Sequence, residues 1–132
     1  MVMTAKILTG LVGLLHLYFL YLEMFQWDKP KGLKVFGNTL EKAKASKVLA
    51  ANQGLYNGFL SAGLLYGLFI GGRTGYEFRI FFLICVIVAG AYGAVTVSRK
   101  IFFIQASPAI VALLMTYFYK DSALSQLQNI FN

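Results

Sequence analysis

The stretch IFFLICVIVAGAYGAVTVS, from Ile80 to Ser98, decides the fold class of this chain. It contains no charged residue, and it has about the 20 apolar residues that a helix needs to cross the hydrocarbon core of a bilayer. Over the whole chain, hydrophobic residues make up 58% and charged residues 13%, against about 25% charged in soluble domains. We therefore expect an integral membrane protein.

Three further apolar segments resemble this one, and together they predict an all-α fold, an integral membrane four-helix bundle. The predicted helices cover residues of about 4–27, 46–72, 76–98 and 100–119, within a single membrane domain of residues 1–132 that ends in a short polar tail at 120–132. Proline and glycine interrupt helices, and they mark the first two breaks, at Asp28 to Gly32 and at Gly71 to Gly75. The third break is expected at Ser98 to Lys100.

The longest connection has a pattern of its own. Leu33, Phe36, Leu40 and Ala43 recur at helical spacing with polar residues between them. This pattern indicates an interfacial amphipathic segment between the first and second helices, or else an extension of the second helix.

The net charge of +7 is concentrated in the connections between the helices. The first connection carries six lysines, which are Lys29, Lys31, Lys34, Lys42, Lys44 and Lys47. Because lysine and arginine are retained on the cytoplasmic side, we expect the first and third connections to be cytoplasmic and both termini to lie outside a bacterial cytoplasmic membrane. With no nucleic-acid-binding fold to accompany the charge, membrane lipids are the expected partners and nucleic acid is not.

Small residues recur at the spacing that allows transmembrane helices to approach closely, as in Gly54 with Gly58 and Gly63 with Gly67. Packing within one chain is the favoured explanation, and a homodimer through these glycine-rich faces is the alternative. Cys85 has no second cysteine to pair with, and the sequence predicts no metal site and no cofactor.

His16 and Glu23 interrupt the apolar run from Ile7 to Trp27 within the first predicted helix. Ionisable side chains within a membrane are costly, by about 2.5–3.5 kcal/mol each on insertion scales, and therefore face a bundle interior or a watery cavity. Seven residues apart, the two differ by only about 20° around the helix and by about 10 Å along it. They therefore share one face, and Trp27 continues the same stripe.

Counting residues inward from the predicted cytoplasmic ends places polar groups of all four helices at similar depth. Glu23, Asn52, Gln53, Tyr92 and Gln105 fall about 6–9 Å deep, with His16 and Asn57 nearer the midplane. A structural hydrogen-bond network is the simpler explanation, since amides link membrane helices. We instead predict a ligand-binding pocket, formed by His16, Glu23, Trp27, Asn52, Gln53, Tyr56, Asn57, Tyr92 and Gln105.

Several of these residues belong to a longer pattern. His16 and Tyr18, then Leu22-Glu23-Met24 and Trp27, then the run NQGLYNGFL from Asn52 to Leu60, resemble the bacterial membrane family named domain of unknown function 1304 (DUF1304). Tyr92-Gly93-Ala94, Gln105 and Pro108-Ala109 continue the resemblance. It implies a small four-helix inner-membrane protein, and it implies no particular reaction.

Three functions are compatible with this sequence. The first is a pocket that binds or transports a small cationic or amphiphilic molecule, with Glu23 as the counter-charge. The second is a membrane-embedded enzyme with isomerase- or hydrolase-like chemistry on a lipophilic substrate, in which His16 and Glu23 are the candidate catalytic acid and base. The third is a structural or accessory membrane protein.

Overall fold

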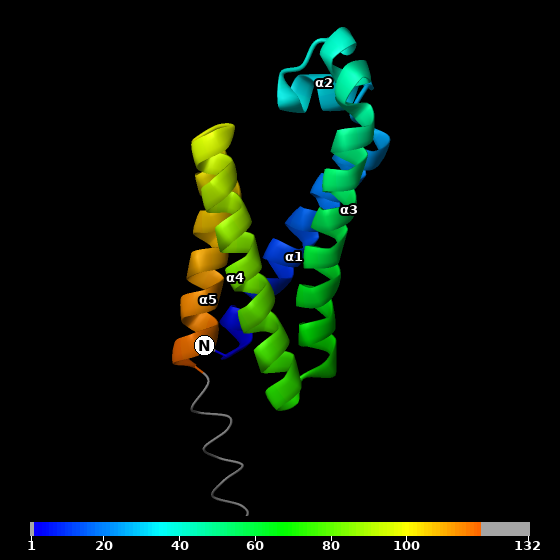
Figure 1. The fold of residues 1–132 in the computed structure, drawn as a ribbon. Coiled ribbons are helices and arrows are strands. Elements are labelled where there is room, and N and C mark those ends of the chain that lie inside the picture. The colour runs from blue at the N-terminus through cyan, green and yellow to red at the C-terminus, as the bar shows by residue number, and fades with distance from the viewer. Residues whose placement is uncertain (1, 120–132) are drawn as a thin grey trace, which may run out of the picture. The chain divides into compact units, whose positions relative to one another are not determined.

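The structure, a computed structural model, describes residues 2–119. Its regular elements are α1 (Val2–Phe25), α2 (Pro30–Phe36), α3 (Leu40–Ile70), α4 (Gly72–Thr96), the π-helical turn η1 (Phe102–Ala106) and α5 (Ser107–Phe118) (Figure 1). No strand occurs in this range, which confirms the all-α class. The polar tail predicted at 120–132 lies outside the described residues.

Two of the helices, Val2–Phe25 and Gly72–Thr96, are long and apolar enough to cross a membrane. Only 33% and 22% of the residues in their most apolar windows are buried, whereas the core helix of a soluble protein would be mostly buried. These exposed apolar surfaces favour membrane association. The longer helix α3 is less apolar, because it carries the amide residues Asn52, Gln53 and Asn57.

The described chain divides into two compact units. Unit 1 comprises residues 2–13 and 62–119, and unit 2 is Leu14–Ser61. Unit 2 contains the second half of α1, the short helix α2 and the first part of α3. Its helices meet at Gly54, where an added Cβ would lie 2.8 Å from Met24 Cγ and 3.0 Å from Glu23 Cβ. The absence of a side chain at Gly54 therefore allows α3 to lie directly against α1.

The connector, which we define as residues 26–39, combines the two structures that the sequence left open. Pro30 is the first residue of α2, where its missing N–H is not needed. The helix ends at Gly37, whose φ of 65° is the left-handed conformation that glycine adopts readily. α3 then begins at Leu40, earlier than the predicted start at 46, and Thr39 Oγ1 accepts a hydrogen bond from Lys42 N. The segment is thus both a short helix and an extension of α3.

Side chains fasten the connector to the helices on either side of it. The Trp27 indole packs on the Phe36 ring at 4.7 Å and donates from Nε1 to Ser46 Oγ at 3.1 Å. Lys47 Nζ donates to Asp28 Oδ2 at 2.8 Å. The connector is therefore held by an aromatic contact, a hydrogen bond and an ion pair.

In unit 1, α3 and α4 form a hairpin with a one-residue turn. Gly71 makes this turn with a φ of 61°, so α4 begins at Gly72 rather than near residue 76 as predicted. Behind the turn, a Cβ added to Gly75 would collide with the backbone oxygen of Gly67. The two helices therefore approach as closely as their backbones permit.

The second hairpin of unit 1 joins α4 to η1 and α5, which lie beside α4 (Figure 1). Gly90 faces Ala106, and an added Cβ would lie 2.9 Å from Ala106 N. The predicted fourth helix is interrupted by the π-helical turn, in which Ser107 N donates to Phe102 O. Pro108 follows and lacks the N–H that a regular α-helix would use, which accounts for the irregular turn before it.

The glycines that the sequence analysis considered for a dimer face contact other helices of the same unit. Gly54 and Gly58 contact α1, and Gly63 and Gly67 contact α4. Packing within the chain thus occupies these positions, and the homodimer stays a prediction.

Candidate functional site

Glu23 lies at the centre of a polar cluster in unit 2. Gln53 Nε2 donates to Glu23 Oε1 at 2.9 Å, and Asn57 Nδ2 donates to Glu23 Oε2 at 2.7 Å. The two amides thus bind both oxygens of one carboxylate. We call these three residues the acid–amide cluster.

The local sequence explains this geometry. Gln53 and Asn57 are four residues apart on α3, so they project from the same face one turn apart. Gly54 lies between them and brings α3 close to α1 at Glu23. The short side chains of α3 can then reach the carboxylate without bending either helix.

The cluster holds a buried acid without a cation. Glu23 is only 4% exposed, and neither ion pair of residues 2–119 includes it. Each of its oxygens accepts one hydrogen bond from this part of the chain, although a carboxylate has about four acceptor positions. Asn57 is buried, whereas Gln53 is exposed, so the cluster reaches the protein surface at Gln53.

His16 and Trp27 lie on either side of the cluster along the chain. His16 is fully buried in α1, with its ring edge-on to Phe19 at 5.6 Å. Trp27 was predicted to continue the stripe of His16 and Glu23, but α1 ends at Phe25 and the indole turns into the connector. Its contacts with Phe36 and Ser46 belong to that connector.

The other predicted site residues are at the protein surface or belong to unit 1. Asn52 is exposed, and Tyr56 is 62% exposed with its ring beside Phe59. Tyr92, in α4 of unit 1, is 72% exposed. Gln105, in η1 of unit 1, is half-buried. The structure therefore brings together Glu23, Gln53 and Asn57 from the predicted set.

One buried charged residue was missed by the sequence analysis. Arg79 falls within the helix predicted at 76–98, but it was not among the predicted site residues; it lies inside α4 and is only 8% exposed. Its Nε donates to Gly75 O at 3.2 Å. The available signal was its position four residues after Gly75 and directly before the uncharged run that starts at Ile80.

No group of three or more His, Cys, Asp and Glu side chains that could hold a metal ion occurs in the described part of the chain. The chemistry of the cluster is instead that of a carboxylate positioned by neutral donors. Such a group attracts a cation or accepts a proton.

Comparison with known proteins identifies the family of this chain. Residues 10–117 match the family described as protein of unknown function DUF1304. The chain belongs to the DUF1304 family. It is also 36% identical over 114 residues to the uncharacterised protein YpaA of Lactococcus lactis subsp. lactis, an alignment that covers 85% of this chain and 95% of YpaA. No solved structure matches the chain.

Membership confirms the resemblance drawn from the run at Asn52 to Leu60. All three residues of the acid–amide cluster lie inside the segment that matches DUF1304. The matched segment of this family member therefore contains a buried carboxylate held by two amides.

Proposed function

We propose that this DUF1304 protein is a small four-helix inner-membrane protein whose acid–amide cluster binds or transports a small cationic or amphiphilic molecule. One observation supports this most directly: Glu23 is buried, held by Gln53 and Asn57, and not paired with a cation among residues 2–119. The ligand would supply the positive charge, and the amides would hold the carboxylate in position for it.

Magnitudes favour a ligand over a purely structural network. An acid within a membrane helix costs about 2.5–3.5 kcal/mol on insertion scales. Hydrogen bonds between membrane helices contribute about 0.6 kcal/mol each on average. The two hydrogen bonds that Gln53 and Asn57 donate to Glu23 therefore do not offset the cost of inserting this acid. Neutral residues could link the two helices without that cost.

The proposed topology places both termini outside and the lysine-rich connector in the cytoplasm. Five connector and α3 lysines support this, because they have no carboxylate partner among residues 2–119: Lys29, Lys31, Lys34, Lys42 and Lys44. Cysteine labelling tests it with Lys44→Cys on a Cys85→Ala background. Labelling of that position from the outside alone would reverse the topology.

The experiment for the cluster is equilibrium dialysis of tetraphenylphosphonium, a lipophilic cation, against the protein in mild detergent. We expect Glu23→Gln to bind it more than about tenfold more weakly, since an ion pair at about 5 Å in an effective dielectric of about 20 contributes about 3 kcal/mol before desolvation. Glu77→Gln is the matched control, because Glu77 is an exposed acid in α4 paired with Arg73.

Two outcomes would redirect the proposal. Equal binding by Glu23→Gln and Glu77→Gln, with unchanged thermal stability, would make the cluster a structural network and favour the accessory role. Conversion of a bound lipophilic molecule into a product that requires Glu23 would select the enzyme. That chemistry would then have to bridge the roughly 10 Å along α1 between Glu23 and His16.

A further inference from the structure

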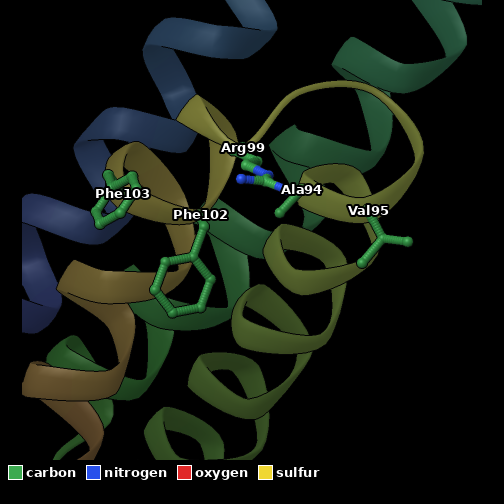
Figure 2. Close-up of a pocket in the computed structure, with 5 residues that line it drawn as sticks. All are labelled: Ala94, Val95, Arg99, Phe102 and Phe103. Atoms are coloured by element: carbon green, nitrogen blue, oxygen red, sulfur yellow. The ribbon is translucent and has the colours of Figure 1, made fainter.

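A hollow of about 460 Å³ lies in unit 1, at the end of the hairpin between α4 and η1. Its lining residues are Ala94, Val95, Arg99, Phe102 and Phe103. Figure 2 shows the Arg99 guanidinium directed toward Ala94, with Val95 on one side and the two phenylalanine rings on the other. Arg99, which is exposed, is thus the one cation in a lining of otherwise apolar side chains.

The backbone creates this hollow by tight packing on one side and irregular structure on the other. Gly90 against Ala106 and Gly93 against Ile101 hold η1 close to α4. Beyond that contact α4 ends, where Val97 N and Ser98 N both donate to Gly93 O. The π-helical turn then sets Phe102 and Phe103 outside the regular helical register.

The position of the hollow along α4 matches the level of lipid headgroups. With 25 residues, α4 is about 37 Å long, more than the roughly 30 Å of a bilayer's hydrocarbon core. Arg99 follows the end of α4, so it lies beyond the hydrocarbon when α4 spans the membrane. The lining residues Val95 and Phe103 are 89% and 70% exposed, as expected of side chains that lie against acyl chains.

The charge at this place has no partner in the described chain. Neither Arg99 nor its neighbour Lys100 pairs with a carboxylate of residues 2–119. Arginine binds phosphate through two parallel N–H donors, and the apolar side chains beside it offer contacts to a hydrocarbon chain. An amphiphile with a phosphate and a hydrocarbon chain satisfies both parts of the hollow.

We propose that this hollow is a binding site for an anionic phospholipid, with Arg99 on the lipid phosphate and an acyl chain against Val95, Phe102 and Phe103. The proposal is independent of the acid–amide cluster, because every residue of the hollow belongs to unit 1. The sequence indicated only that Arg99 is a basic residue of a cytoplasmic connection, and the proposal gives this residue a ligand.

The test is native mass spectrometry of the protein in mild detergent, titrated with phosphatidylglycerol or phosphatidylcholine. We expect tighter binding of phosphatidylglycerol, and about tenfold weaker binding of it by Arg99→Gln, the loss of a charge-assisted contact. Lys100→Gln is the matched control, since it removes the same charge at the next residue, outside the lining. It should weaken binding less than Arg99→Gln does, by at most the roughly fivefold that general attraction of one basic residue to an anionic lipid contributes.

A second variant tests the apolar wall. Phe103→Ala should weaken phosphatidylglycerol binding while leaving the melting temperature unchanged, because the Phe103 side chain is mostly exposed. Equal effects of Arg99→Gln and Lys100→Gln would reduce the site to general electrostatic attraction and overturn the proposal. Displacement of the lipid by inorganic phosphate, or equal binding of phosphatidylcholine, would overturn it as well.

Discussion

Unit 2 and unit 1 use the same packing device and place different chemistry beside it. In unit 2, Gly54 brings α3 against α1, and the adjacent side chains are an acid and two amides. In unit 1, Gly90 brings α4 against η1, and the adjacent residue is Ala106. Glycines therefore set how closely two helices approach. The side chains around each glycine decide whether the helix contact includes hydrogen bonds or only apolar packing.

The two units also bury charges of opposite sign. Unit 2 buries Glu23, and unit 1 buries Arg79. Glu23 is bound by side chains of another helix, whereas the hydrogen bond of Arg79 goes to Gly75 O of its own helix. Glu23 thus links two helices of its unit, whereas the hydrogen bond from Arg79 Nε lies within α4.

The largest effect should come from breaking the tight packing of unit 1. In Gly75→Ala the new Cβ meets the backbone oxygen of Gly67, which cannot move aside as a side chain can. We expect a loss of about 3 kcal/mol in the free energy of unfolding, at the upper end for overpacking. Circular dichroism of unfolding in detergent would measure it.

Gly10→Ala is the control for that variant, because its Cβ would meet only Leu68 Cδ1 at 3.6 Å, an ordinary contact. Both substitutions gain the same helix propensity, about 1 kcal/mol. Gly10→Ala should therefore be neutral or slightly stabilising. If both variants unfold alike, close approach of α3 and α4 is not what stabilises unit 1.

An intermediate effect should separate the two amides of unit 2. Asn57→Ala removes a donor from the more buried side of the cluster and should cost about 2 kcal/mol in the free energy of unfolding, as for an unsatisfied buried acceptor. Gln53→Ala should cost about 1 kcal/mol or less in the free energy of unfolding. Gln53 is exposed, so solvent or lipid headgroups can replace the hydrogen bond that it donates to Glu23. Chemical unfolding of both variants measures the difference, and the reverse order would contradict this description of the cluster.

The smallest effect concerns pH and the connector. The hydrogen bond from Lys47 lowers the pKa of the Asp28 carboxyl below its ordinary value. A carboxyl whose pKa is lowered on folding stabilises the folded state above its unfolded pKa, and this contribution is lost as the pH falls through the folded pKa. The gap in melting temperature between the wild type and Asp28→Asn should therefore be small at pH 6 and should shrink as the pH falls below the ordinary aspartate pKa of about 3.9. A gap that widens on acidification would contradict the assignment.

The sequence predicted the helical class well, because the uncharged run from Ile80 to Ser98 is long enough for a helix and lies almost wholly within α4. Counting at 1.5 Å per residue also predicted a similar depth for Glu23 and Gln53, and Gln53 does donate to Glu23. It placed Asn57 nearer the midplane with His16, but Asn57 donates to the other oxygen of Glu23. The same counting failed at Trp27. Helical periodicity ends where the helix ends, and α1 ends at Phe25.

Two other features could not be read from local patterns. The burial of Arg79 was not predicted: a one-residue turn at Gly71 brings α4 back against α3, where Gly67 faces Arg79 Cγ. The π-helical turn at Phe102–Ala106 follows from Pro108 and from the contact of Ala106 with Gly90, which is distant in sequence. Turn length and contacts between helices decided these features, and neither appears in the spacing of apolar residues.

Trp27 is the single tryptophan of the chain, and its indole lies in the connector, hydrogen-bonded to Ser46. Indole emission depends on hydration and on hydrogen bonding at Nε1, so all tryptophan fluorescence of this protein originates from one known place. Trp27 is thus an intrinsic fluorescent probe of the connector, and no attached dye is needed. Opening of the connector would appear as a change in that emission, while motion confined to unit 1 would leave it unchanged.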